Sequence, residues 1–166
     1  MILDREEVYT TQDQIESVLT YWQRALKLDN WNISIKLVPI SDPDIDYNKQ
    51  GCVNIIKEAL QAEIKILRHD DWINFGPFKQ DMERVIIHEL MHVLFHAFDP
   101  NLNDDEDDEF KKTAFHQIIE TLARSFVNVS RESGAYQSPK PINCKLCVAD
   151  GHGHSVVPSS YAAKRN

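Results

Sequence analysis

The order of apolar and polar residues predicts a helix followed by a small sheet. Apolar residues recur at helical spacing over residues 11–28, and either of two threonines at the start of this segment suits a helix cap. Strict alternation over residues 31–38 predicts a strand with one buried face, and two more short strands are expected at residues 52–56 and 62–67. A polar loop over residues 39–51 separates the first strand from the other two.

Helical spacing returns over residues 79–98 and again over residues 105–131. The first of these segments is apolar nearly all round, which is typical of a buried helix. We expect it to stop at Asp99-Pro100, because proline cannot continue a helix. The second segment is expected to turn six residues toward the core: Phe110, Ala114, Phe115, Ile118, Leu122 and Phe126. The acidic run between the two segments is most simply a solvated helix start, with a calcium site as the alternative.

These elements predict an α+β fold with one domain over residues 1–133. Residues 134–166 are interpreted as a tail, because they hold three of the five glycines and three of the seven prolines and show little periodicity. Three cysteines, two of them in this tail, are too few and too unevenly placed for a disulfide framework.

The chain is acidic, with a formal charge of −8. Four basic residues and one aspartate make the tail +3, so the body before it carries −11. Phosphate binding needs a cationic surface, so nucleic acid is not expected as a partner. No apolar run approaches the roughly 20 residues that cross a bilayer, and the first residues lack the apolar core of a signal peptide. We therefore expect no membrane association and a cytoplasmic location.

The segment His88–His92 carries the clearest chemical signal. Residues four apart in a helix point the same way, so both imidazoles can reach one metal ion. Zinc suits such nitrogen donors. Glu89 follows the first histidine, where its carboxylate can take a proton from a zinc-bound water and deliver it to a leaving amine. Two histidines and a glutamate buried together are costly unless they are paired or bind a metal. The alternative is a core helix whose histidines only form hydrogen bonds to neighbours.

The motif and its setting resemble the zincin metallopeptidases over roughly residues 10–130. A helix, a small sheet that begins with a Trp-containing strand, the motif helix and a second helix form the minimal zincin arrangement. The chain is most similar to small zincin-like proteins of bacteriophages and mobile elements, and more distantly to the ImmA/IrrE group. The resemblance implies peptide hydrolysis at one catalytic zinc. It also implies substrate binding along an edge strand, for which order in the chain favours residues 62–67.

A catalytic zinc normally has three protein ligands and one open position. Resemblance to the gluzincin-like branch implies Glu120 as the third ligand, in a stretch similar to that family's ligand helix. His116, one turn earlier, is the alternative, either as the ligand or as a residue that supports a ligand or an oxyanion. Phe98 stands where metzincins have a third histidine, which excludes that subclass. His96 lies about 12 Å from His88 along a straight helix, too far to share the ion.

The tail offers a second candidate metal site. Cys144 and Cys147, followed by His152 and His154, predict a structural zinc, with an exposed redox pair or a metal-free tail as the alternatives. Because the tail is basic and the body acidic, residues 156–166 are also a candidate self-inhibitory segment over the cleft.

The predicted function is a zinc-dependent endopeptidase that acts on a protein or peptide, with a phage or host protein as partner. Its expected location is the cytoplasm, or the virion for a phage-encoded protein. The alternative is a zincin-like binding or structural module, such as a phage particle component, that keeps the metal with little turnover. The intact Glu89 favours the enzyme. A DNA-associated SprT-like protease has less support, because the body is acidic and that family's third histidine is missing.

Overall fold

The computed structural model describes residues 6–45, 49–72, 79–99 and 109–136. Its main elements are a helix, three strands and two more helices: α1 (Gln12–Ala25), β1 (Asn32–Val38), β2 (Gly51–Ile56), β3 (Gln61–Leu67), α2 (Met82–Leu94) and α3 (Glu109–Ser133). Two short 3-10 turns follow β2 and β3: η1 (Lys57–Ala59) and η2 (His69–Asp71). The predicted α+β fold class is therefore confirmed.

β3 lies in the middle of the sheet, between β1 and β2. It runs parallel to β1 and antiparallel to β2, so that Ile64 stands opposite Ile35 on one side and Val53 on the other. The prediction that residues 62–67 form an edge strand is therefore wrong. The prediction assumed that the last strand in the sequence lies at the edge of the sheet. Instead, the chain crosses from β1 to the far edge, where it forms β2, and then returns through the middle as β3. β2 is the strand left at that far edge.

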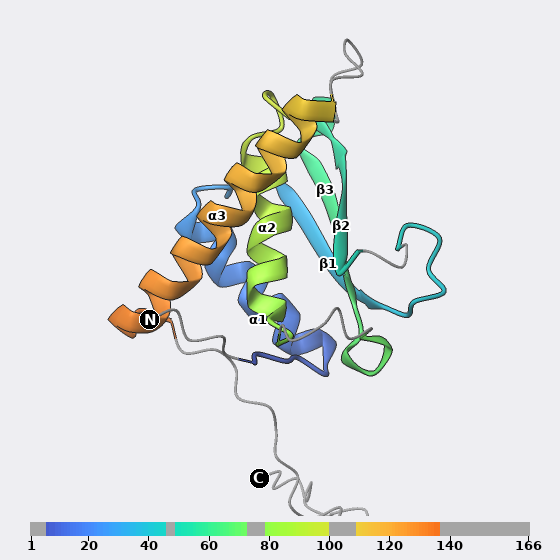
Figure 1. Cartoon of the computed structure of the whole chain (residues 1–166), viewed down its shortest axis with the longest axis vertical. Helices are drawn as coiled ribbons and strands as arrows, with labels where there is room; N and C mark the ends of the chain where they lie inside the picture. Colours follow the sequence, from blue (N-terminus) through green and yellow to red (C-terminus); the bar gives the residue numbers. More distant parts are fainter. Residues whose placement is uncertain (1–5, 46–48, 73–78, 100–108, 137–166) are drawn as a thin grey trace, which may run out of the picture.

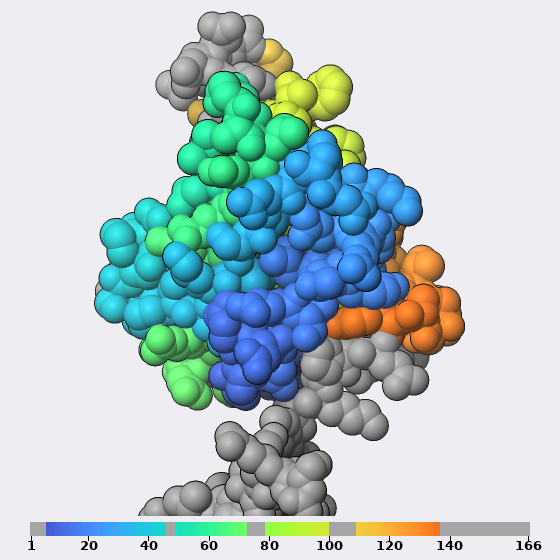
Figure 2. All heavy atoms as spheres, turned by 180° about the vertical axis from the view of Figure 1, so that it is seen from behind, coloured from blue at the N-terminus to red at the C-terminus, as the bar shows by residue number. Residues whose placement is uncertain are grey.

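α1 and α2 cover one face of the sheet, and α3 packs against α2 (Figure 1). Alternate strand residues point to this face, so Ile35, Ile64 and Ile66 are buried beneath the helices. The opposite face carries polar residues, among them the ion pair of Lys36 and Glu63. Seen from behind, α1 and β1 spread across the middle of the molecule, and the turn between β2 and β3 lies toward the top (Figure 2). The face under the helices carries the main core, as the alternation predicts, while Val38, Ile45 and Leu67 form a second, smaller buried cluster.

Side chains cap the first two helices. Thr11 accepts a hydrogen bond from the backbone N–H of Gln14, and the Gln14 side chain accepts one from the Thr11 N–H, which together form a capping box. Asp81 accepts a bond from the backbone N–H of Arg84 at the start of α2. Ten of the thirteen residues of α2 are buried. The prediction of a buried motif helix is therefore confirmed.

α2 ends at Leu94, before the stop predicted at Asp99. The backbone N–H groups of His96 and Phe98 bond to carbonyls three residues back, in tightened turns typical of a helix end. The chain turns back here, and this turn brings Asp99 beside the last turn of α2.

α3 turns a different face to the core from the one predicted. Its buried residues form one row: Ile119, Ala123, Val127 and Ser130. Of the six residues predicted to face inward, three are partly buried and three are exposed: Ala114, Phe115 and Leu122 in the first group, and Phe110, Ile118 and Phe126 in the second. The prediction followed the largest apolar side chains. Packing against α2 instead selects the adjacent row, where a small residue allows close approach of the two helices.

Arg131 joins the far end of α3 to the start of α2. Its guanidinium lies 2.9 Å from both carboxylate oxygens of Asp81 and 2.8 Å from Oε2 of Glu83. Although burial acts to lower the pKa of Arg131, these two carboxylates raise it above its usual value. This contact anchors α3 at one end, while its first half lies across the middle of α2.

Among the described residues, no helix combines the length and apolar character that a membrane span requires.

Candidate metal centre

Three histidines from two helices meet on the side of α2 that faces α3. His88 and His92 lie one turn apart on α2, and His116 comes from α3. One ring nitrogen of each lies within 4.8 Å of those of the other two. His92 Nε2 and His116 Nε2 are 3.2 Å apart. Two nitrogens that each lie about 2.0–2.1 Å from a tetrahedral zinc are about 3.3 Å from each other, so this donor set fits the ion.

The histidine rings differ in exposure and orientation. His92 is buried, His88 is half-buried and His116 is exposed. The His88 and His116 rings are stacked with centroids 5.5 Å apart, and the His92 ring stands edge-on to both. Partial burial lowers the pKa of His116, and the neighbouring His92 and His88 lower it further. A neutral imidazole keeps the lone pair with which a metal is bound.

A buried carboxylate supports His92. Asp99 Oδ2 lies 2.5 Å from His92 Nδ1, and Asp99 is only 1% exposed. From the sequence, Asp99 is expected only to mark the end of the motif helix, together with Pro100. Its position beside His92 depends on the tight turn after α2, which periodicity does not predict.

Glu120 lies beside His88 and two arginines. Its Oε2 is 3.2 Å from His88 Nδ1, and its Oε1 bonds to Arg84 and, at 2.8 Å, to Arg124 Nε. Although burial acts to raise the pKa of Glu120, the bonds from His88 and Arg124 and the charge of Arg84 lower it to about 2. The carboxylate is therefore ionised at neutral pH. Its Oε1 has two arginine partners outside the three-histidine cluster, and its Oε2 contacts His88 at Nδ1.

Glu89 lies on the sheet side of α2, against β2. Its Oε1 would be 3.2 Å from a Cβ built on Gly51, which would also lie 2.9 Å from Val85 Cγ1 and 3.1 Å from the Lys65 carbonyl oxygen. Only glycine leaves room at this point of β2 for the carboxylate. Burial raises the pKa of Glu89, while the charges of His88, His92 and Lys49 oppose that rise.

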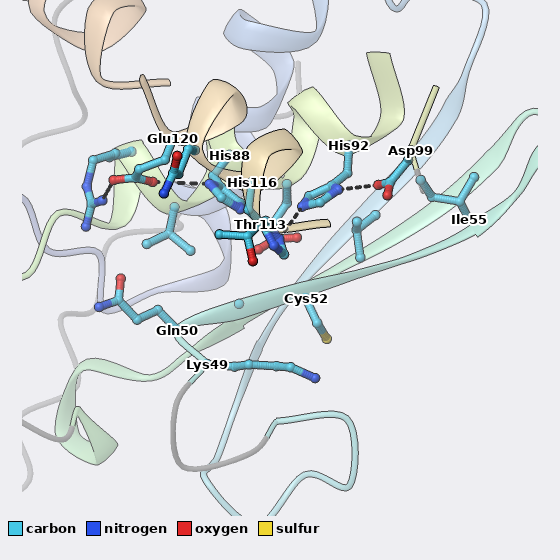
Figure 3. Close-up of a pocket in the computed structure, with 16 residues that line it drawn as sticks. Lys49, Gln50, Cys52, Ile55, His88, His92, Asp99, Thr113, His116 and Glu120 are labelled. Carbon is cyan, nitrogen blue, oxygen red and sulfur yellow. Dashed lines mark hydrogen bonds and ion pairs between the residues drawn. The ribbon is translucent and has the colours of Figure 1, made fainter. Parts of the chain in front are cut away.

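The histidines, Glu89 and the edge strand line one cleft of about 810 Å³. Figure 3 shows the three histidines grouped together, with Glu120 at one end of the group and Asp99 at the other, and with β2 running past them. Cys52 also lines this cleft. Burial and the nearby Glu89 raise the pKa of the Cys52 thiol to about 11. This thiol therefore stays protonated and is a poor nucleophile.

The structure brings together the motif residues and one of the two third-ligand candidates. His88, His92 and His116 converge, whereas Glu120 contacts His88 from the side. This arrangement favours His116 over Glu120 as the third ligand. His96 packs against Trp31 and bonds to the Val93 carbonyl.

The second predicted metal site lies outside the described residues, as does the proposed inhibitory segment. These assignments comprise Cys144, Cys147, His152, His154 and residues 156–166.

Sequence reasoning missed two residues of the centre, Asp99 and Arg84. Of the two, Arg84 could have been found more easily from the sequence, because it lies one helical turn before His88.

Comparison with family models, curated proteins and solved structures gives no significant match. The resemblance to zincins therefore rests on this chain's own residues and remains a prediction.

Proposed function

We propose that this protein is a zinc metallopeptidase in which His88, His92 and His116 hold the metal and Glu89 is the catalytic base. One observation carries the proposal: three imidazole nitrogens converge in an open cleft that the carboxylate of Glu89 also lines. Three nitrogen ligands and an accessible fourth position are the usual donor set of a hydrolytic zinc.

When bound, zinc would lower the pKa of a water molecule and polarise the peptide carbonyl. The protein's own part is the handling of the proton. Burial raises the pKa of Glu89, which suits a carboxylate that takes a proton and then passes it to the leaving amine. Its position next to His88 keeps this transfer at the metal.

The substrate proposed for this site is an extended peptide that pairs with β2. β2 is an edge strand, and its residues Gly51, Val53 and Ile55 line the cleft. An edge strand has backbone groups without a neighbouring strand, and a peptide can bond to them. Strand pairing would hold the scissile bond in the cleft between β2 and the histidines.

The test measures zinc content and cleavage of a peptide library by the wild type and two variants. We expect Glu89→Gln to keep the zinc content of the wild type and to lose at least about 100-fold in cleavage rate, because only the proton acceptor is removed. His96→Ala, outside the cluster, is the control and should keep both properties. A wild type without bound zinc would contradict the metal site.

The same experiment separates the enzyme from the alternative of a non-catalytic binding module. Zinc in both the wild type and Glu89→Gln, with no peptide cleaved by either, would contradict catalysis and favour that alternative.

A further inference from the structure

We propose that Glu120 orients His88 rather than binding the metal, and that Arg84 and Arg124 hold Glu120 in this role. Asp99 plays the corresponding part for His92. The inference rests on the metal site of the proposed function and concerns how that site is kept ready to bind.

A histidine binds zinc through a ring nitrogen that carries no proton. When Nδ1–H donates to a carboxylate, the proton is fixed there and Nε2 keeps its lone pair. Both motif histidines have a carboxylate at Nδ1: Glu120 at 3.2 Å from His88 and Asp99 at 2.5 Å from His92. His92 Nε2 then faces His116. The two carboxylates thus turn both histidines toward the same point.

The arginines determine which oxygen of Glu120 faces His88. Oε1 is bonded to both Arg84 and Arg124, so Oε2 is the oxygen that remains for His88. Arg84 lies one turn before His88 on α2, and Arg124 lies one turn after Glu120 on α3. Each helix therefore supplies one cation. If Glu120 turned toward the metal, it would leave its part-buried contact with Arg84 as well as its exposed contact with Arg124. Breaking a charge pair that is shielded from water is costly.

Asp99 and Glu120 differ in their surroundings. The Asp99 side chain is 2% exposed, whereas that of Glu120 is 30% exposed. Hydrogen bonds to a charged group are stronger where water is excluded. We therefore expect the loss of Asp99 to weaken metal binding more than the loss of Glu120.

The test titrates zinc and cobalt into the zinc-free full-length protein and its variants, without substrate. Glu120→Ala should lower zinc affinity about 10- to 100-fold, the usual effect of losing a residue that supports a ligand. Glu120→Gln keeps an oxygen for His88 and should lower it less. Both variants should keep the wild-type cobalt absorption spectrum, because the ligands are unchanged. His116→Ala should alter that spectrum. Gln117→Ala, which changes another cleft residue of α3, is the matched control.

Two results would overturn the inference. A cobalt spectrum of Glu120→Gln that changes as it does in His116→Ala would make Glu120 a ligand. Unchanged zinc affinity in Glu120→Ala would remove its positioning role. Arg124→Gln offers a second route if Glu120→Ala does not fold, because Arg124 is 54% exposed; unchanged affinity there would remove the part assigned to this arginine.

These outcomes are independent of the peptidase proposal. The expected metal affinities and spectra with no cleavage of any peptide would contradict the peptidase alone. Cleavage by the wild type with unchanged zinc affinity in Glu120→Ala would contradict the positioning role alone.

Discussion

Trp22 and Glu83 form a hydrogen bond in the core, although they lie 61 positions apart in the sequence. The Trp22 indole N–H donates to Glu83 Oε1 at 2.9 Å, and Arg131 donates to the second oxygen. Glu83 is 0% exposed. A buried carboxylate needs such partners, so this relationship ties α1, α2 and α3 together at the end of α2 away from the metal centre.

Trp22→Phe is expected to destabilise the fold. It removes a bond to a buried charged oxygen, and leaving such a group without a partner costs about 1–3 kcal/mol of unfolding free energy or more. Urea unfolding of the zinc-free protein measures the loss. Trp31→Phe is the control for ring size, because Trp31 is also buried and no indole hydrogen bond of Trp31 is found within the described residues. Equal losses in both variants would contradict a specific contribution from the Trp22–Glu83 bond.

The variant Glu83→Gln is expected to change how stability depends on pH. Burial raises the pKa of Glu83, although Trp22 and Arg131 oppose the rise. The folded protein then holds this proton more tightly than the unfolded chain. The stability that Glu83 contributes is full below its unfolded pKa of about 4.3 and is lost as the pH rises through the folded value.

Compared with Glu83→Gln, the wild type should therefore lose unfolding free energy from about pH 4 upward. Urea unfolding of both proteins at several pH values gives this difference in unfolding free energy. Contributions from other titrating groups cancel in the difference, because both proteins contain those groups. Parallel pH profiles of the two proteins would show that Glu83 has the same pKa in both states.

Two neighbouring isoleucines test the face that α3 turns to the core. Ile119 is 0% exposed and Ile118 is 57% exposed. Replacement of a buried isoleucine by alanine costs about 2–5 kcal/mol, because a cavity remains. Ile119→Ala should fall in this range, whereas Ile118→Ala should change stability by less than about 1 kcal/mol. The reverse order in thermal or urea unfolding would restore the face predicted from the large apolar residues.

Gly51→Val is expected to separate metal binding from catalysis. A Cβ at this position already meets Val85 and Glu89 at 2.9 and 3.2 Å, so a branched side chain displaces the Glu89 carboxylate. None of the three atoms nearest to this Cβ belongs to a histidine. Zinc content should remain that of the wild type while peptide cleavage falls, with a loss of about 1–3 kcal/mol in stability from overpacking. Full cleavage activity in a folded Gly51→Val variant would contradict the place assigned to Glu89.

Periodicity predicted where the helices and strands lie, because each depends on residues close together in the chain. It predicted the histidine pair for the same reason, since His88 and His92 are neighbours on one helix. The place of β3 in the sheet could not be predicted this way, because strand order depends on how loops cross and not on local alternation.

The rest of the site also depends on contacts between distant residues. His116 and Glu120 lie one turn apart on α3, and only the rotation of that helix against α2 decides which of them faces the motif histidines. The prediction of that rotation was wrong for the apolar residues, and the choice of Glu120 came from the family resemblance. The position of Asp99 depends on the tight turn after α2, which has no periodic pattern.

The placement of His92 and His116 on different helices has a consequence for folding. An ion bound to both would act as a cross-link that closes a loop between residues 24 positions apart, and a closed loop has less chain entropy to gain on unfolding. The metal would therefore hold the first half of α3 in place at the end opposite the Arg131 contact. Amide hydrogen exchange around His116 should slow when zinc is added, while that around Val127 changes little.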